Sequence, residues 1–401
     1  MTDVAKAELE SCCACNSSNL ELITELPQFP HIGIFLDDYH KTKNYPLIDN
    51  SVCACQNCGH VQLGYAVDAS FLYPTDFQHK TSQSASAMQA NNVLFDFAQK
   101  VCTSVDIGLV AEIGCNDTFL LQKFAEMGIN VVGVDPILKG REEKFLQDLD
   151  PSLVPRFNVL GEFIENANFT DTFSKSPDLY VTNFVFEHLQ NPYEVTKTIL
   201  DSAHDEAIII IGVPGAEFLL LNNRFDQLSH QHYQQFTIPS LTQMVKRAGG
   251  EIIDLFVNFS NWGQILIAFK KGGSKPSGVV EKALSIEQIK DSFSTFNQHL
   301  DMLKARVQTV NHKPILAFGA AQNFPVFAYF YNDPLPFDDI LDDHPLRQNT
   351  TFPHYPVKIS KPKESYKGCV GIMTGPDYAR VLMGRMAELE FDHIIVPFSS
   401  L

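Results

Sequence analysis

Two pairs of cysteines near the N-terminus limit most strongly how this chain can fold. Cys12 and Cys15 form one Cys-x-x-Cys pair, and Cys55 and Cys58 form a second, with 39 residues between the pairs. Two such pairs can deliver four thiolates to a tetrahedral zinc ion and stabilise a segment that is too small for a core of its own. We therefore predict that residues 1–80 form a module around one structural Zn2+, because four protein ligands close the site to substrate.

Two further cysteines leave the ligand set open. Cys13 and Cys53 lie next to these pairs and could each replace a member, and a set of reduced thiols without metal is the alternative to a zinc site. A zinc module can also indicate nucleic-acid binding. However, the chain carries 30 Lys and Arg against 47 Asp and Glu, a net charge of −17. That charge repels nucleic acid and anionic membranes, so we exclude both as general partners.

Length and terminal composition bound the class of protein. The chain has 401 residues, which is too long for one compact core and predicts two or three domains. Residues 1–10 include three acidic side chains and no apolar segment, and no apolar run approaches the about 20 residues that span a bilayer. We therefore expect a cytoplasmic protein, in which cysteines remain reduced and available to a metal.

From residue 109 onward, short apolar runs alternate with stretches of helical spacing. This alternation predicts a doubly wound, mainly parallel sheet. A first series has expected strands at 109–114, 130–135, 178–184, 207–214, 251–258 and 263–271. A second series has a long expected helix at 279–310 and expected strands at 314–321, 337–343, 370–375 and 393–397.

The expected fold class is therefore α/β, in three parts. The N-terminal zinc-binding module (1–80) precedes a central, doubly wound Rossmann-like domain (81–271), which opens with a helix at 81–103. The linker at 272–278, rich in Gly, Ser and Pro, separates this domain from a smaller Rossmann-like α/β domain at 279–401.

The turn after the first expected strand points to a nucleoside cofactor. In Glu112-Ile-Gly-Cys-Asn-Asp-Thr118, Gly114 lets the backbone approach a ligand, and Asp135 ends the next strand, where a carboxylate accepts hydrogen bonds from ribose hydroxyls. The turn lacks two glycines of the GxGxxG pattern, which disfavours a pyrophosphate and therefore an NAD-dependent dehydrogenase. S-adenosylmethionine has a ribose but no phosphate and fits. An ordinary turn is the alternative. The candidate cofactor-binding residues are Glu112, Gly114, Asn116, Asp117, Asp135 and Asn183.

Histidines near the same sheet edge are candidates for acid–base chemistry. His188 follows the expected strand at 178–184, and His230 and His232 follow the strand that ends at Pro214. An imidazole accepts a proton near neutral pH. No matching carboxylate or cysteine set is evident near His230 and His232 in the sequence, so we expect no catalytic metal there. Packing or surface roles are the alternative for all three histidines.

In order and spacing, these motifs resemble the three-part sugar C-methyltransferases of the tetronitrose 3-C-methyltransferase type. The resemblance covers nearly the whole chain, including the cysteine pairs, the family's E-I-G-x-N-D-G cofactor turn and its second-strand acid. The family's F-D-x-x-Y-H-E-H signature falls on Phe225–His232, and its V-D-x-x-P-x-K-Q turn falls on Leu341–Gln348. The resemblance implies a zinc module, a central methyltransferase domain that binds S-adenosylmethionine and a Rossmann-like C-terminal domain.

The resemblance also implies a substrate and a base. The acceptor is a nucleotide-linked sugar with a 4-keto group, and His232, the last histidine of the signature, removes the proton alpha to that group. The resulting enediolate carbon then attacks the sulfonium methyl, so the enzyme supplies positioning and proton removal. His230 and His79 are the other catalytic candidates, and His79 lies in the family's substrate-binding stretch at Phe77–Ser84.

The departures from the family pattern concentrate on the acceptor side. Ser229 and Gln231 replace the Tyr and Glu of the signature, Phe77 and His79 replace two tyrosines, and Asn323 replaces a lysine in the C-terminal domain. An amide cannot stabilise a neighbouring imidazolium as a carboxylate would. We therefore expect a changed acceptor. Methyl transfer to oxygen or nitrogen of another small metabolite, or a catalytically silent binding paralogue, are the alternatives.

Overall fold

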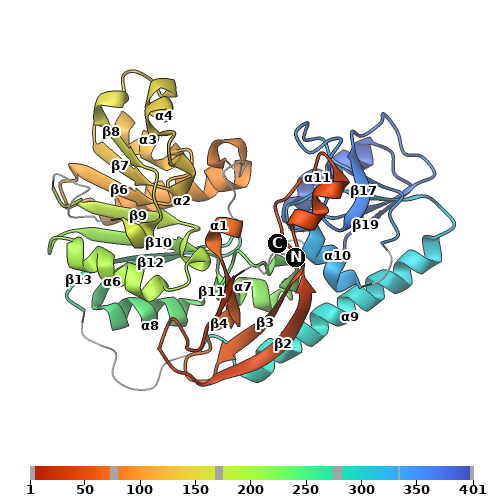
Figure 1. The fold of residues 1–401 in the computed structure, drawn as a ribbon, viewed down its shortest axis with the longest axis horizontal. Coiled ribbons are helices and arrows are strands. Elements are labelled where there is room, and N and C mark those ends of the chain that lie inside the picture. Colours follow the sequence, from red (N-terminus) through yellow and green to blue (C-terminus); the bar gives the residue numbers. More distant parts are fainter. Residues whose placement is uncertain (1–4, 73–79, 168–174, 274–281, 333–334, 398–401) are drawn as a thin grey trace.

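The computed structural model describes residues 5–72, 80–167, 175–273, 282–332 and 335–397, which form three connected parts (Figure 1). The central α/β domain lies on one side, the C-terminal α/β domain lies on the other, and the N-terminal strands lie below and between them. Within the described residues, no helix combines the length and the apolar composition needed to cross a membrane.

The N-terminal module is built on a four-stranded antiparallel sheet that includes a strand from the central part of the chain. Strands β2 (Leu20–Phe29), β3 (Ile48–Cys55) and β4 (Val61–Leu63) lie within the first 80 residues, whereas β11 (Gln234–Gln235) pairs with β4. The segment just before β11 is therefore anchored to this module. Other elements here are β1 (Lys6–Glu8), η1 (Tyr39–Asn44), β5 (Tyr65–Val67) and α1 (Ala69–Leu72).

The central domain contains a seven-stranded sheet in the order β12-β13-β10-β9-β6-β7-β8. The five strands from β10 to β8 are parallel, whereas β13 runs antiparallel to both β10 and β12. The strands are β6 (Leu109–Ile113), β7 (Asn130–Val134), β8 (Phe157–Leu160), β9 (Leu179–Asn183), β10 (Ile208–Val213), β12 (Gly250–Asn258) and β13 (Gln264–Lys271). The main helices are α2 (Ala85–Val101), α3 (Phe119–Glu126), α4 (Glu142–Asp148), α6 (Pro192–Ser202), α7 (Ala216–Leu221) and α8 (Ile238–Ala248).

Both faces of the central sheet are buried, which explains the unbroken apolar run of β10. Ile208 and Ile210 pack into a cluster that includes side chains of α2 and α3, whereas Ile209 and Ile211 pack into a second cluster with side chains of α6 and α8. Successive side chains of a strand point to opposite faces, so a strand covered on both sides must be apolar at every position.

The strand order reverses between β6 and β9. From β6 the chain continues outward to β7 and β8, and it then returns to place β9 and β10 on the other side of β6. In open α/β sheets, ligands bind outside the carboxyl ends of the strands at such a switch point. The turn that follows Ile113 and the residues that follow Asn183 therefore face one candidate crevice.

The C-terminal domain repeats this topology on a smaller scale. Its sheet has the order β16-β17-β15-β14-β18-β19, with β14 parallel to both β15 and β18, so its own switch point lies between β14 and β18. The strands are β14 (Ile315–Phe318), β15 (Asp339–Leu341), β16 (Thr351–Phe352), β17 (Tyr355–Ser360), β18 (Val370–Met373) and β19 (His393–Ile395). The helices are α9 (Ile286–Val310), α10 (Phe324–Tyr331) and α11 (Ala379–Glu388).

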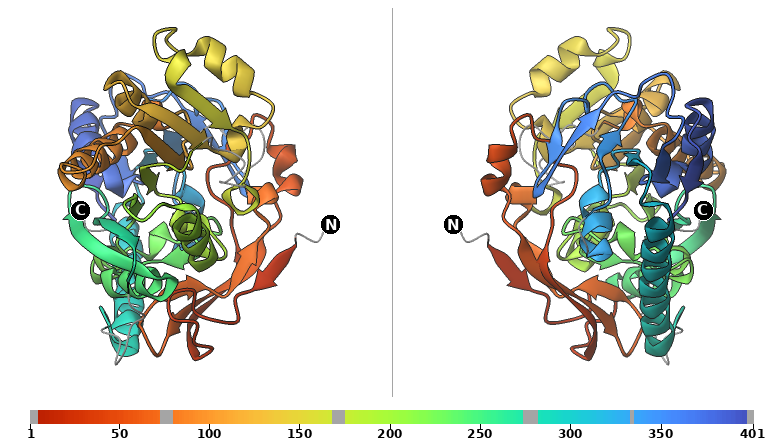
Figure 2. Two further views of the ribbon diagram at one scale, coloured as in Figure 1. Left: turned by 90° about the vertical axis from the view of Figure 1, so that its left-hand side faces the viewer. Right: turned by 90° about the vertical axis from the view of Figure 1, so that its right-hand side faces the viewer.

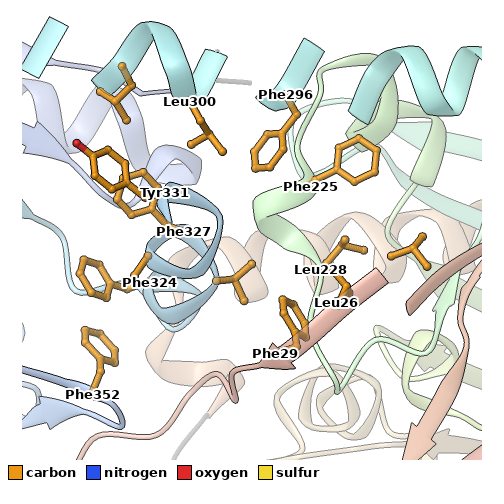
Figure 3. Close-up of a cluster of buried hydrophobic side chains, with 14 of the residues drawn as sticks. Leu26, Phe29, Phe225, Leu228, Phe296, Leu300, Phe324, Phe327, Tyr331 and Phe352 are labelled. Atoms are coloured by element: carbon orange, nitrogen blue, oxygen red, sulfur yellow. The ribbon is translucent and has the colours of Figure 1, made fainter. Parts of the chain in front are cut away.

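One apolar core joins all three parts. Figure 3 shows Phe29 of β2 and Phe225 of the signature segment together with side chains of α9 and α10, and all belong to a single buried cluster. Phe225 packs on Phe296 with ring centroids 5.7 Å apart, and Phe324 stacks on Phe352 at 4.8 Å. The views in Figure 2 place the N-terminal strands and α9 at the same end of the molecule. The three parts therefore share a core rather than hanging from free linkers.

The fold class and the strands of the two series are as predicted, with differences in detail. Strands β8, β16 and β17 were not expected, because their short sequences show no long apolar run. The helix expected at 279–310 begins at Ile286, where Ser285 and Gln288 form a capping box, and most of the linker at 272–278 lies outside the described residues.

Candidate active site

The four predicted cysteines meet in the N-terminal module. The sulfur atoms of Cys12, Cys15, Cys55 and Cys58 all lie within 4.8 Å of one another, and the Cys12–Cys58 and Cys15–Cys55 distances are both 3.5 Å. Sulfurs on a tetrahedral zinc with Zn–S bonds of about 2.3 Å are roughly 3.8 Å apart. Four thiolates this close repel one another without a cation. The cluster therefore fits one zinc ion with no position left for substrate.

The two cysteine pairs have the same local conformation. Asn16 and Gly59, which directly follow the pairs, both have positive φ and both donate a backbone hydrogen bond of 2.8 Å to the first cysteine of their pair. The structure also decides whether Cys13 or Cys53 replaces a member of the ligand set. The Cys13 sulfur lies 3.3 Å from Nε2 of His60, and the Cys53 sulfur lies near the Ser51 hydroxyl, so neither belongs to the cluster.

The first turn of the central domain is tightly constrained. Gly114, Asn116 and Thr118 all have positive φ, an uncommon conformation for Asn and a strained one for β-branched Thr. A Cβ on Gly114 would lie 2.2 Å from Cγ2 of Val185, the second residue after the end of β9. The glycine is thus required for close packing of two strand ends at the switch point, in addition to the ligand approach expected from the sequence.

Asp135 holds this turn in place. Its Oδ2 accepts a 2.8 Å hydrogen bond from the backbone N–H of Asn116, and its Oδ1 accepts one of 3.0 Å from Ile137. A carboxylate has about four acceptor positions, so a ribose would share Asp135 with the two backbone groups. Burial raises the pKa of Asp135, which is only 7% exposed.

Three carboxyl groups surround the turn. Oε2 of buried Glu112 and Oδ1 of Asp117 have no hydrogen-bond partner among the described residues. Burial, followed by the charges of Asp135 and Asp117, raises the pKa of Glu112 well above its usual value. Orphaned acceptors of one sign fit a ligand that brings donors and positive charge. S-adenosylmethionine, with its ammonium and sulfonium groups, has that chemistry.

Asn183 lies at the carboxyl end of β9, across the switch point from the turn. Its Oδ1 accepts a 2.8 Å hydrogen bond from Nε2 of Gln264, and its Nδ2 has no partner among the described residues. Asn183 thus offers a donor to the crevice, opposite the acceptors of the turn.

The stretch that corresponds to the family's substrate-binding segment rests on the cofactor turn. The backbone N–H of Thr81 donates to Oδ1 of Asn116, and that of Ser82 donates to Oδ2 of Asp117, both at 3.0 Å. Asn116 and Asp117 therefore connect the expected cofactor side to the expected acceptor side. His79, in the same stretch, lies outside the described residues.

A cluster of one carboxyl and two imidazoles lies at the carboxyl end of β9. Glu187, His188 and His232 each place a polar atom within 4.8 Å of the others, and the two imidazole centroids are 4.8 Å apart. Nδ1 of His188 donates to the backbone carbonyl of Gln231 at 2.7 Å, which joins the two loops. No sequence motif places this carboxylate beside His232, because Glu187 lies 44 positions before Gln231 in the chain.

Burial sets the protonation states in this cluster. Burial, followed by the charge of His188, lowers the pKa of His232, which favours the neutral imidazole that can accept a proton. Burial raises the pKa of Glu187 to about 8, which favours the neutral acid at physiological pH. Neighbouring groups with pKa values displaced in opposite directions are typical of acid–base sites.

His230, in contrast, has both ring nitrogens in hydrogen bonds with the protein. Nδ1 contacts Nδ2 of Asn50 at 3.2 Å, and Nε2 contacts the carbonyl of Phe29 at 3.0 Å, in a site that is 1% exposed. These partners belong to the N-terminal module, so His230 fixes the signature segment to that module.

The signature segment is also fixed by an ion pair that the sequence analysis missed. Asp226 accepts hydrogen bonds of 2.8 and 2.9 Å from the guanidinium of Arg224, and both side chains are buried. The backbone carbonyl of Asp226 accepts from Nδ2 of Asn323, which begins α10. Asn323, which replaces the family's lysine, thus connects the C-terminal domain to this segment.

Comparison with known proteins agrees with this geometry. Residues 106–255 match the family model described as a methyltransferase domain. The chain is 23% identical over 269 residues to the C-methyltransferase NovU of Streptomyces niveus, a match that covers 67% of this chain and 62% of the relative. The resemblance to C-methyltransferases expected from the sequence is thereby confirmed, although the match spans less than two thirds of the relative's length.

Solved methyltransferase structures also match, over somewhat less than half of the chain. The glycopeptide N-methyltransferase MtfA in complex with S-adenosylmethionine is 11% identical, with 45% of this chain and 87% of that chain covered and a TM-score of 0.35. The magnesium protoporphyrin IX methyltransferase of Synechocystis PCC 6803, with bound SAH, is 11% identical, with 47% and 84% covered and a TM-score of 0.37. Both scores are below 0.5, so the fold assignment rests on the strand order and on the matched domain.

Proposed function

We propose that this protein is a methyltransferase that uses S-adenosylmethionine to methylate a carbon atom of a nucleotide-linked keto sugar. The observation that supports it most is a juxtaposition at one switch point. Unpaired acceptors of Glu112 and Asp117 lie at the end of β6, and the neutral imidazole of His232 lies with residues that follow β9. These acceptors and this imidazole thus lie at the same edge of the sheet, where they would serve a cationic cofactor and its acceptor.

The residues divide the work between two sides of the crevice. Asp135 would hold the ribose, and Glu112 and Asp117 would face the positive methionine portion. The bound cofactor supplies an electrophilic methyl group. His232 would accept the proton alpha to the keto group, which leaves a nucleophilic carbon aligned with that methyl. The nucleotide-linked sugar as acceptor follows from the family resemblance.

A calorimetric titration with S-adenosylmethionine tests the cofactor. We expect a single site, weakened by roughly 1.5–3 kcal/mol in Asp135→Ala, the scale for hydrogen bonds to a charged group. Because Asp135 also holds the turn, the variant Asp135→Asn is needed as well. It removes the negative charge but keeps the size of the side chain. It keeps one acceptor and should weaken binding less than Asp135→Ala does. Unchanged affinity in both variants would contradict the ribose assignment.

Reaction in deuterium oxide tests the site of methylation. Candidate 4-keto sugar nucleotides should exchange their alpha hydrogen with solvent during turnover, because carbon methylation passes through a deprotonated carbon. The replacement of the family's Tyr and Glu by Ser229 and Gln231 keeps transfer to oxygen or nitrogen as the second candidate. Methylated product without any exchange would favour that second candidate.

A further inference from the structure

We propose that Glu187 is a positioning residue that supplies His232 with the carboxylate partner that Gln231 cannot provide. This inference rests on the proposed methyl transfer to carbon. Its geometric basis is the cluster of Glu187, His188 and His232, in which two partly exposed imidazoles lie in front of one buried carboxyl.

Glu187 is placed between strand β9 and helix α6 without a structural task of its own. Its side chain is 3% exposed, its Oε1 lies 3.9 Å from Nε2 of His188, and its Oε2 has no hydrogen-bond partner among the described residues. A buried carboxyl oxygen without a hydrogen bond destabilises the fold. Such a group is expected where function needs it.

Gln231 cannot take this role. It occupies the position of the family's Glu, but its side-chain amide is directed to the carbonyl of Leu72, 3.5 Å away, and it carries no charge. Its backbone carbonyl accepts from Nδ1 of His188 instead, which orients that ring beside His232. The carboxyl near His232 therefore comes from the loop after β9 and not from the signature segment.

His232 needs a carboxylate partner because an isolated imidazolium is unfavourable in a site of this kind. When His232 accepts a proton, it becomes a cation next to a second imidazole, His188, in a largely buried site. A carboxylate close by removes that net charge. No other charged group among the described residues contributes to the shifted pKa of Glu187, which arises from burial.

Each turnover takes one proton from the acceptor and releases one proton to water. The C–H bond of the acceptor breaks and an N–H bond forms on His232, while Glu187 releases its own proton to water at the exposed edge of His188 and becomes the partner carboxylate. The methyl group then moves from sulfur to carbon, and the S–C electron pair stays on sulfur. Finally, His232 returns its proton to Glu187, so that one proton leaves per turnover.

The first arm of the test needs no substrate. Ring resonances of His188 and His232 are followed by nitrogen-15 NMR of the histidine-labelled, zinc-loaded protein from pH 5 to 9. In wild type they should shift with a titration near pH 8, the pKa of Glu187. Glu187→Gln should abolish that shift, and Glu187→Gln/Gln231→Glu should restore a titration. The matched control is Glu217→Gln, since Glu217 is a second glutamate whose pKa is raised by burial, but it lies outside the cluster.

The second arm measures turnover with a 4-keto sugar nucleotide. Glu187→Gln should lower kcat by about 10–100-fold without changing the affinity for S-adenosylmethionine, and the double variant should recover most of the loss. A merely structural role would not be rescued from position 231. The proposal would be overturned if Glu187→Gln left the pH dependence of the histidine resonances unchanged. It would also be overturned if Glu187, His188 and His232 bound a second metal ion in addition to the zinc. A normal titration together with absent methyl transfer would instead refute the proposed function.

Discussion

At the scale of single residues, the cofactor turn shows how few positions decide the site. Gly114 allows the ends of β6 and β9 to meet, Asp135 fixes the turn by two backbone hydrogen bonds, and Asn116 and Asp117 hold the stretch at Thr81. Each of these contacts follows from a position at the end of a strand. Substitutions here should therefore affect the stability of the turn, and a matched control is needed to separate packing from conformational strain.

Replacing Gly114 by Ala should destabilise the protein by about 2–4 kcal/mol. The added Cβ would lie 2.2 Å from Val185, and φ of +73° disfavours any residue with a Cβ. Denaturant unfolding measures the loss. Gly140→Ala is the matched control, because Gly140 has φ of +72° but nothing within 4 Å, and it should cost only the conformational part. Equal losses in the two variants would contradict the packing argument.

Replacing His232 by Ala should lower kcat by about 10²–10⁴-fold, the usual contribution of a general base. The affinity for S-adenosylmethionine should stay unchanged, because the imidazole belongs to the acceptor side of the crevice. Single-turnover kinetics and calorimetry check the two statements separately. His299→Ala, on α9, serves as control. A His232→Ala enzyme with near-normal turnover would remove His232 from the base role.

At the scale of elements, the two α/β domains use the same turn twice. In the central domain the backbone N–H of Asn116 donates to Asp135, and in the C-terminal domain that of Ala320 donates to Asp342 at 2.7 Å. The difference lies in the charge around each acid. Arg347 pairs with Asp342 at 3.2 Å, whereas no such cation pairs with Asp135 among the described residues. Asp135 therefore has room for a ligand where Asp342 is already paired with a cation of the protein.

The N-terminal zinc module holds the loop that carries His232, because β11, which follows that loop, pairs with β4. Cys55→Ser should abolish stoichiometric zinc and lower the free energy of unfolding by at least about 3 kcal/mol, because metal binding energy is part of the folding energy. Since β11 pairs with β4, the loop that carries His232 should loosen as well, and activity should fall. Metal analysis, denaturant unfolding and turnover check these effects.

The control for the zinc prediction is Cys369→Ser, a cysteine of the C-terminal domain outside the cluster. It should leave metal content, stability and turnover close to wild type. Wild-type protein purified without chelator that holds no zinc would contradict the assignment of the cluster as a structural site.

At the scale of the whole molecule, the signature segment is the point where the three parts meet. Its Phe225 enters the common core, and its His230 bonds the N-terminal module. Its Asp226 accepts from Asn323 of the C-terminal domain. Away from the signature segment, the hydroxyls of Ser86 and Tyr378 form a 2.6 Å hydrogen bond between the two α/β domains. The three parts are therefore joined by direct contacts around this segment.

This junction predicts a loss of stability in mild acid. Burial lowers the pKa of His230 to about 4 and, together with the charges of His230 and His354, that of His31 to about 3. An unfolded histidine titrates near 6.5, so below that pH the unfolded chain binds more protons than the folded one. The stabilisation is complete above about pH 6.5 and is lost as the pH falls toward 4, by about 2–3 kcal/mol for each histidine.

Denaturant unfolding between pH 5 and 7.5 checks this dependence. His31→Gln keeps a donor for the carbonyl of Pro46, which Nε2 of His31 contacts at 2.9 Å, and it should flatten the pH dependence. His312→Gln, at an exposed position, should leave the dependence unchanged. Identical slopes in wild type and His31→Gln would show that this imidazole is not the source.

The sequence by itself determined the features that depend on local pattern. The Cys-x-x-Cys pairs specified the metal cluster, because turn geometry and thiolate chemistry are set within a few residues. Apolar runs such as that of β10 specified the parallel sheets, because burial on both faces demands an apolar residue at every position. The alternation of strands and helices specified the two doubly wound domains and thus the edge at which a ligand binds.

Only the tertiary structure decided what depends on residues far apart in the chain. It brought Glu187 beside His232, added β11 to the N-terminal sheet and gave His230 its partners in that module. Pairing between short strands and contact between loops depend on the register and packing of whole domains, which no local periodicity encodes. For the same physical reason, a carboxylate absent from the signature could be supplied from another loop, where the sequence alone gave no means to find it.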